Sequence, residues 1–454
     1  MSATAIRELV DLDDAERRAL ADQMMGFAER AYPIFRSLTG DGVRATLELM
    51  RETVPFLEVH EVPSGDPVLD WTVPKEWNVH EAWLEAPDGR RVVDVADHTL
   101  HLLGYSVPFE GTVSRAELED HLYSLPGRPD LIPYRTSYYA ERWGFCLQDA
   151  VRRDLPDGDY RVMIDTTLED GHLTYGEAVL PGRSEQEILI STHCCHPSLA
   201  NDNLSGLAVV AALASQLAKL EPEQRRYTMR FVFAPGTVGA IVWLARNRDV
   251  VDRIRHGLVA SNLGDAGDFH YKRSRGGTLS RGASTEGWPV DVAVERAAGS
   301  LGFPVEVSDF VPFGYDERQY GSPGFDLPVG SLSRSPWGRY PEYHTSADDL
   351  SILDGDRLVD SLRLFLGTCA ELEDSPCLLN LHPHAEPQLG RRGLYGSLGG
   401  DEGGRERELA MLWVLNLADG RRSVEEIVRR SGLEADVFEA VVQALLDAEL
   451  VAWV

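Results

Sequence analysis

The middle of the chain, from about residue 150 to 375, alternates short apolar runs with longer amphipathic stretches. "EQEILIST", "YTMRFVFAPG" and "HGLVASNLGD" have the length and composition of buried strands. "SGLAVVAALASQLAKL" and "AIVWLARNRD" lie between them with the spacing of helices. This alternation predicts an α/β fold, with parallel strands joined by right-handed crossovers and helices flanking a mixed sheet.

The N-terminal third has two different patterns. Residues 13 to about 55 are predicted to be helical: "DDAERRALADQMMGFAERAYPIFRSL" has apolar positions at helical spacing, and the turn signal "TGDG" then breaks the chain. Residues 56–145 instead alternate short β-type runs with Pro and Gly turns. We therefore predict that 1–55 and 146–390 form one α/β domain, and that 56–145 is a β-rich domain inserted into it.

The C-terminal part predicts a third unit. Residues 390–408 are rich in Gly and charge, which indicates a linker. Residues 406–454 then give a helix, a second helix capped by Ser423, a third helix and a short apolar end. This order is the outline of a winged-helix-like domain.

Composition and charge narrow the function classes. Apolar residues make up 43% of the chain and charged residues 26%, which is typical of a soluble globular protein. No apolar run approaches the roughly 18 residues of a membrane span. Five cysteines without framework spacing favour a reduced, cytoplasmic setting. The net charge of -29 argues against nucleic acid or anionic membrane as a partner.

The C-terminal domain itself argues against DNA binding. Its expected recognition helix, "EADVFEAVVQALLD", contains no Lys or Arg to contact phosphates. A packing or dimerisation role, and with it a homo-oligomer, is the favoured interpretation.

Candidate chemistry gathers where the predicted strands end, which is where ligands sit in parallel sheets. "STHCCHPSLANDNLSG" follows the first strand and supplies His193 and Asp202, both of types that bind zinc. His344, in "YPEYHTSADDL", is the best remote third ligand, with Asp348 and Asp349 as groups that could orient it. Simpler interpretations stay open: a hydrogen-bonded structural histidine, an Asx turn at "NDN", and buried packing thiols at Cys194 and Cys195.

Several phrases together carry a family resemblance. "STH…ANDNLSG", "FVFAPGTVGA", "SNLGDAG" and "YHTSADDL" resemble the zinc aminopeptidase and glutaminyl cyclase superfamily. "FRSLTGDGVRATL", "VPKEWNV", "YDERQYGSPGFDLPVGSL" and "PEYHTSADDL" are similar to a bacterial family that joins an aminopeptidase-like domain to a small inserted β domain and a C-terminal winged helix. The resemblance covers nearly the whole chain.

The resemblance implies a site with one or two zinc ions. The ligands that it implies are His193, Asp202 as a bridging carboxylate, His344, Asp265 or the nearby Asn262, and His196, which belongs to the closer family's "HPS".

One departure from the superfamily pattern matters for mechanism. The parent peptidases carry a Glu-Glu pair after the next strand, of which one is the general base and the other a metal ligand. This chain has Gly236 and Thr237 there, and neither can accept a proton from water. We predict that Glu317 or Asp316, in "YDERQYG", replaces the base or binds the substrate's amine; a salt-bridged loop is the alternative.

The candidate substrate clamps are Arg318, Tyr320 and Arg334. Three functions compete at this point. The first is a zinc hydrolase acting on an amide or peptide-type bond of a small molecule or short peptide, in polysaccharide or secondary-metabolite biosynthesis. The second is a zinc enzyme that forms or cyclises amides, and the third is a ligand-binding protein with a degraded peptidase site.

Overall fold

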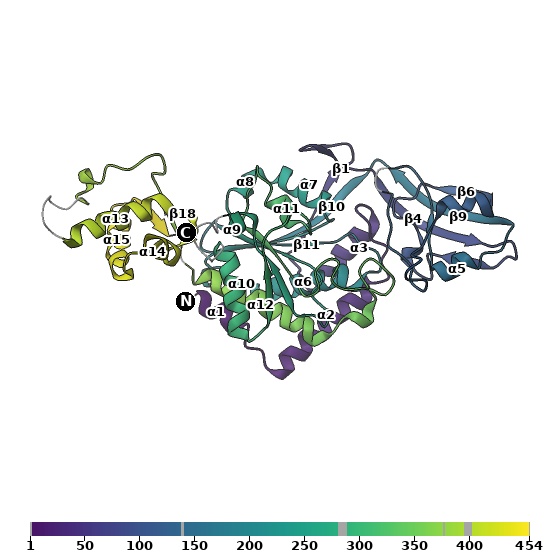
Figure 1. Ribbon diagram of the computed structural model, residues 1–454, viewed down its shortest axis with the longest axis horizontal. Coiled ribbons are helices and arrows are strands. Elements are labelled where there is room, and N and C mark those ends of the chain that lie inside the picture. The colour runs from purple at the N-terminus through teal and green to yellow at the C-terminus, as the bar shows by residue number, and fades with distance from the viewer. Residues whose placement is uncertain (1, 138–139, 280–287, 376, 395–401, 454) are drawn as a thin grey trace.

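The computed structural model describes residues 2–137, 140–279, 288–375, 377–394 and 402–453. Three parts follow one another along its longest axis: a large central α/β domain, a small β module at one end and the C-terminal module at the other (Figure 1). The predicted linker 390–408 lies partly outside the described residues.

The central domain is built on an eight-stranded mixed sheet with the order β1-β10-β12-β11-β13-β16-β14-β15. Its strands are β1 (Glu58–Pro63), β10 (His172–Leu180), β11 (Glu187–His193), β12 (Thr228–Ala234), β13 (Ile254–Ala260), β14 (Phe269–Lys272), β15 (Val305–Ser308) and β16 (Val329–Ser333). β12, β11, β13 and β16 run parallel, and the first three coincide with the predicted strands. Their carboxyl ends therefore meet at one edge.

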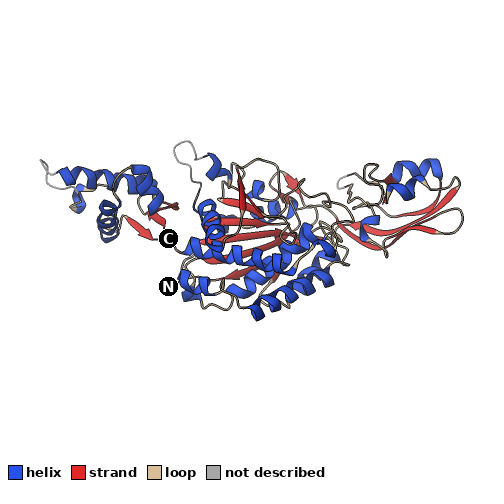
Figure 2. Ribbon diagram, turned by 60° about the horizontal axis from the view of Figure 1, so that its bottom comes forward, coloured by secondary structure: helices blue, strands red, loops and turns tan. Residues whose placement is uncertain are grey.

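Helices cover both faces of this sheet (Figure 2). One face carries α1 (Ser2–Glu8), α2 (Asp14–Ala31), α3 (Asp41–Met50), α6 (Gly206–Leu217), α10 (Pro289–Leu301) and α12 (Gly355–Glu373); the other carries α7 (Val238–Arg246), α8 (Arg248–Val251) and α11 (Glu317–Tyr320). The strand alternation explains the two cores, because Ile188 and Ile190 pack into the first and Leu189 into the second.

The inserted module has its own sheet and core. Its strands, in the order β5-β4-β9-β6, are β4 (Glu76–Glu85), β5 (Arg91–Asp94), β6 (Phe109–Ser114) and β9 (Asp159–Glu169). Smaller elements complete it: β7 (Leu122–Tyr123), β8 (Phe145–Cys146), α4 (Arg115–Leu118) and α5 (Asp149–Arg153). The range 56–145 needs correction at both ends, since β1 pairs within the large sheet and β9 belongs to the small one.

The C-terminal module combines three helices with a three-stranded sheet of order β18-β17-β19. Its elements are β17 (Cys377–Asn380), α13 (Glu402–Leu417), β18 (Asp419–Ser423), α14 (Val424–Ser431), α15 (Ala435–Asp447) and β19 (Val451–Trp453). Ser423 caps α14 as expected, because its hydroxyl accepts a hydrogen bond from the backbone N–H of Glu426. The predicted start of this domain at residue 406 is too late, since β17 pairs with both β18 and β19.

Three further short elements are β2 (Pro67–Val68), β3 (Trp71–Thr72) and α9 (Arg275–Leu279).

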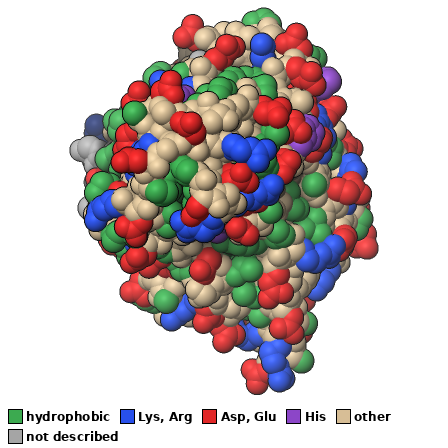
Figure 3. All heavy atoms as spheres, turned by 90° about the vertical axis from the view of Figure 1, so that its right-hand side faces the viewer, with side chains coloured by type: hydrophobic (Ala, Val, Ile, Leu, Met, Phe, Trp, Pro, Cys, Tyr) green, Lys and Arg blue, Asp and Glu red, His purple; other side chains and the backbone are tan. Residues whose placement is uncertain are grey.

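Within the described part of the chain, no helix combines the length and the apolar character that crossing a membrane requires. Acidic side chains are scattered over the face at the inserted-module end rather than gathered in one patch (Figure 3).

Candidate metal centre

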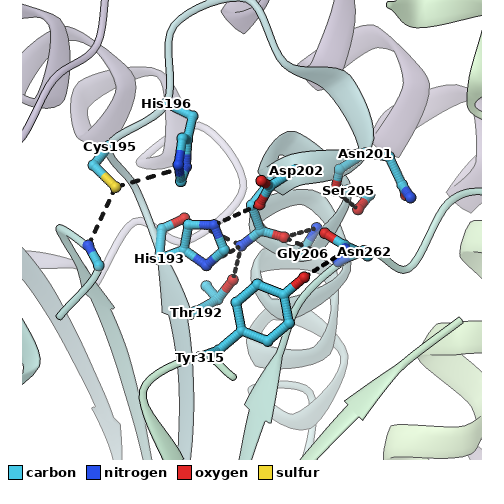
Figure 4. Close-up of polar contacts among 12 residues, drawn as sticks. Thr192, His193, Cys195, His196, Asn201, Asp202, Ser205, Gly206, Asn262 and Tyr315 are labelled. Atoms are coloured by element: carbon cyan, nitrogen blue, oxygen red, sulfur yellow. Dashed lines mark hydrogen bonds and ion pairs between the residues drawn. The ribbon is translucent and has the colours of Figure 1, made fainter. Parts of the chain in front are cut away.

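The candidate centre begins at the carboxyl end of β11. His193 is the last residue of that strand, and its Nε2 lies 2.8 Å from Oδ1 of Asp202. Asp202 lies in a short, irregular π-helical turn, Ala200–Ser205, which leads directly into α6. The Asn203 side-chain amide donates to Thr192 Oγ1 at 2.7 Å and to the His193 carbonyl at 3.1 Å, which ties the turn to the strand. Figure 4 shows the contact between His193 and Asp202.

Two further imidazoles surround the same carboxylate. His344 reaches it from a distant loop and places Nε2 3.0 Å from Oδ2 of Asp202. The His196 ring lies 5.0 Å from the His193 ring and 5.2 Å from the His344 ring, between centroids. Three histidines therefore converge on one fully buried acid, which brings together four of the five metal ligands expected from the sequence.

The electrostatics favour the protonation states that a metal requires. Burial opposes ionisation of Asp202, but His196, His193 and His344 outweigh it and hold the pKa of this carboxyl well below its usual range. Burial lowers the pKa of His196 to about 3, so its imidazole is neutral at pH 7. A charged carboxylate at Asp202 beside a neutral imidazole at His196 is the form in which these two groups bind metal.

The residues present fit zinc. One ligand atom each from His193, His196 and Asp202 lies within 4.8 Å of the others, among the residues that the structure describes. Oδ2 of Asp202 and Nε2 of His344 lie 3.0 Å apart as an ion pair, and within the described part of the chain neither atom makes a hydrogen bond. Buried polar atoms without hydrogen bonds are costly, and a cation bound by both atoms would lower that cost.

Asp348 supports the centre differently from what the sequence suggested. Its carboxylate accepts hydrogen bonds from the backbone N–H groups of Asn201 at 2.6 Å and Asp202 at 3.1 Å, and so positions the turn rather than the His344 ring. Burial, together with the nearby Asp202, raises the pKa of Asp348 to about 7. Asp349 instead caps a short helix by accepting from the Ser351 N–H.

A carboxylate does occupy the strand end that lacks the Glu pair. The backbone N–H of Thr237, just after β12, donates to Oδ1 of Asp316 at 2.7 Å. Asp316 is buried, and burial raises its pKa to about 6. At Gly236, a built Cβ would lie 3.5 Å from both His193 Cβ and Cys195 Sγ. The acid at this place is therefore the N-cap residue of α11 and does not come from the segment after β12.

Three other residues predicted to act in catalysis or substrate binding make structural contacts instead. Glu317 is fully buried in an ion pair with Lys272. Tyr320 lies in the core, where its hydroxyl bonds Ser191 Oγ at 2.8 Å. Arg334 is 3% exposed and donates to the carbonyls of Gly267 and of Arg357 on α12. These contacts support structural roles for Glu317, Tyr320 and Arg334.

Arg318 is partly buried beside Asp316, with its Nε unpartnered, and so remains a candidate substrate contact.

Asp265 is not part of the cluster described above. Its carboxylate accepts from the Asn201 side chain at 2.8 Å, the Ser335 hydroxyl at 2.6 Å and the Gly267 N–H at 2.7 Å. Asn262 donates to the Tyr315 hydroxyl at 2.6 Å. Both residues hold loops around the centre.

Two tyrosines that the sequence analysis did not single out border the centre. The Tyr315 ring stacks on His193 at 5.6 Å between centroids, and Tyr134 packs edge-on against both His196 and His344. Tyr134 follows the inserted module's β7, and its N–H donates to the His344 carbonyl at 2.8 Å. Tyr315 adjoins the acids of "YDERQYG", which was a usable signal; nothing local marked Tyr134.

The adjacent cysteines are both buried, and Cys195 Sγ accepts a hydrogen bond from the Gly236 N–H at 3.2 Å. Cys194 belongs to the core of the central domain, and Cys195 packs with that of the inserted module. Burial raises the pKa of Cys194 to about 11 and also raises the pKa of Cys195. Both thiols are therefore protonated at neutral pH.

Comparisons with known proteins agree with this architecture. A curated protein of Clostridium acetobutylicum, provisionally named a polysaccharide biosynthesis protein with an aminopeptidase-like domain, is 45% identical over 94% of this chain and 95% of its own. A crystal structure of a provisionally named peptidase from that organism is 42% identical, with a TM-score of 0.78 and full coverage of both chains.

More distant structures share the fold alone. The zinc aminopeptidase BSAP of Bacillus subtilis is 12% identical, with a TM-score of 0.56 over 77% of this chain and 93% of its own. A peptidase M28 precursor from Shewanella amazonensis is 14% identical, with a TM-score of 0.54 over 81% of this chain and 96% of its own. The aminopeptidase-like fold expected from the sequence is confirmed.

Family models match nearly all of the chain. Residues 377–453 match a winged helix-turn-helix, which confirms the expected C-terminal domain. Residues 25–375 match the model described as a domain of unknown function, DUF4910. The chain therefore belongs to the DUF4910 family and joins its aminopeptidase-like domain to a C-terminal winged helix.

Proposed function

We propose that this protein is a zinc-dependent hydrolase that cleaves an amide or peptide-type bond in a small molecule or short peptide, within polysaccharide or secondary-metabolite biosynthesis. The observation that carries the proposal is the convergence of His193, His196 and His344 on the buried carboxylate of Asp202. When bound, zinc supplies Lewis acidity, which polarises a carbonyl and lowers the pKa of water.

In this proposal the chain's own residues divide the remaining work. Asp316, held by the Thr237 N–H, accepts the proton of the attacking water. The rings of Tyr315 and Tyr134 border the centre and restrict the access of water and of long polypeptides. The restriction by Tyr134 comes from the inserted module, which supports a small substrate.

The first test is the zinc content of the purified full-length protein by elemental mass spectrometry. We expect about one or two zinc ions per chain in the wild type, and their loss in His193→Ala and Asp202→Ala. His382→Ala is the matched control, because His382 is exposed in the C-terminal module and should leave the metal in place. A folded wild type that neither contains nor takes up zinc would favour the binding-protein alternative.

The second test separates the two acids. Asp316→Asn should abolish turnover of an amide substrate panel while zinc content stays unchanged. Glu317→Gln should disrupt the ion pair with Lys272. It should therefore lower the free energy of unfolding and have a smaller effect on the rate of the chemical step. Product analysis by mass spectrometry distinguishes hydrolysis from amide formation or cyclisation, since only hydrolysis incorporates oxygen from labelled water.

A further inference from the structure

A pocket of about 290 Å³ lies beside the candidate metal centre, over one face of the edge strands β14, β15 and β16. The strand registers place Ser333 opposite His270, and both Ser331 and Ser308 opposite Lys272. Since residues two apart share a face of a sheet, these five side chains form one polar floor. The pocket has room for a single ring-sized group and is at the small end of ligand sites.

The charges of this pocket are already balanced. Its three charged lining residues each form an ion pair: Lys272 with Glu317, Arg339 with Glu306, and Asp309 with Arg273. A carboxylate or phosphate ligand is usually recognised by Arg or Lys that is free to pair with it. The pocket therefore favours a neutral ligand.

The floor offers hydrogen bonds that the protein does not use. His270 is 8% exposed, and its buried Nε2 has no hydrogen-bond partner among the residues that the structure describes. Burial lowers the pKa of His270, so its ring is neutral at pH 7 and offers one donor and one acceptor. Serine hydroxyls at 331 and 333 also donate and accept. Ligand hydroxyl groups match this set, because they too do both.

The rim of the pocket is aromatic. The rings of Phe313 and Trp337 lie 4.4 Å apart between centroids and are 53% and 48% exposed. Exposed aromatic faces next to a polar floor suit a ligand with an apolar face and polar edges. A pyranose ring has this character, with C–H groups on its faces and hydroxyls around its edge.

Aromatic contacts also link the pocket to the metal centre. Tyr315 lines the pocket and stacks on His193. On the other side, Trp337 contacts Tyr343, whose ring stacks on His344 at 3.9 Å between centroids. A ring seated in the pocket is therefore a neighbour of the candidate ligands.

We propose that this pocket binds a sugar ring of the substrate, so that the amide presented to the metal centre belongs to an N-acylated amino sugar. The identity of the cleaved bond rests on the hydrolase proposed above, whereas sugar binding by the pocket does not.

The test is binding of N-acetylglucosamine, N-acetylgalactosamine and N-acetylmannosamine to the full-length protein, measured by saturation-transfer NMR and titration. N-acetylalaninamide, which has the amide without the sugar, is the comparison ligand. We expect at least one sugar to bind, and to bind about tenfold more weakly to Trp337→Ala. Trp453→Ala, at an equally exposed tryptophan of the C-terminal module, should bind as the wild type does.

Ser333→Ala provides a second variant on the floor and should also weaken binding of the sugar. The inference is overturned if no sugar binds, if Trp337→Ala and Ser333→Ala bind as the wild type does, or if N-acetylalaninamide binds equally well. Sugar binding by a protein that holds no zinc would support the pocket and refute the hydrolase. Zinc-dependent cleavage of amino-acid amides without sugar binding would support the hydrolase and refute the pocket.

Discussion

Glu76 joins the inserted module to the central domain, and replacing it with Gln tests this junction. Its carboxylate, at the start of β4, accepts hydrogen bonds from Arg44 on α3, at 2.8 Å to Oε1 and 2.7 Å to Oε2. It also accepts from the backbone N–H of His172 at 2.8 Å, where β10 begins. Three segments thus meet at one acid, whose side chain is 12% exposed.

The expected effect follows from the pKa of this carboxyl. The hydrogen bonds from Arg44 outweigh burial and lower the pKa of Glu76 from 4.5 to about 2. At about 1.4 kcal/mol per pKa unit, the folded state favours the ionised form by about 3 kcal/mol. The neutral amide of Glu76→Gln keeps the shape and loses this preference, so we expect unfolding to become easier by about 2–3 kcal/mol at pH 7.

Urea unfolding between pH 7 and pH 2 measures this difference. Because the pKa is lowered on folding, the stabilisation is fully present above pH 4.5 and is lost as pH falls through about 2. The difference in the free energy of unfolding between wild type and Glu76→Gln should therefore be constant from pH 7 to 5 and decrease below that range. Glu52→Gln is the matched control, since Glu52 also binds Arg30 in a bidentate pair but with both side chains 58% exposed. A Glu76→Gln effect no larger than the control's would refute the reasoning.

Three further predictions concern the centre and the core. Asp348→Asn should weaken zinc binding roughly 10- to 100-fold in competition with a chelating dye, because it disturbs the turn that carries Asp202; unchanged affinity would contradict this. The pH–rate profile should rise at or below about pH 6 as Asp316 ionises, since bound zinc can only lower that pKa, and Asp316→Asn should remove the rise. Leu213→Ala, fully buried on α6, should cost about 2–5 kcal/mol in urea unfolding with no change in metal content; a loss of zinc would show that the cavity reaches the centre.

The sequence predicted well wherever local pattern and site coincide. β11, β12 and β13 are short, apolar and separated by helices. His193 at the end of β11 and Asp202 in the turn after it could therefore be proposed from the local sequence alone. His344 stood out only as the best remote candidate, because it lies 142 positions after Asp202 and nothing local indicates their 3.0 Å approach.

Long-range pairing explains most of what the sequence did not reveal. β1 was assigned to the inserted module because its sequence shares the pattern of short β-type runs and Pro and Gly turns, yet it pairs with β10, more than a hundred residues later. Choosing between Asp316 and Glu317 was equally impossible locally, since the partners that separate them, Thr237 and Lys272, lie on other elements. Tyr134 reaches the centre only because the inserted module folds back against the His344 loop.

The cysteines at 194 and 195 have a practical consequence. Each thiol is sealed within a different core, and Cys377 lies in the sheet of the C-terminal module, so three units of the chain each contain a thiol that reagents reach only after local opening. Timed alkylation followed by peptide mass spectrometry would therefore report the order in which these units open, using native residues as the labels.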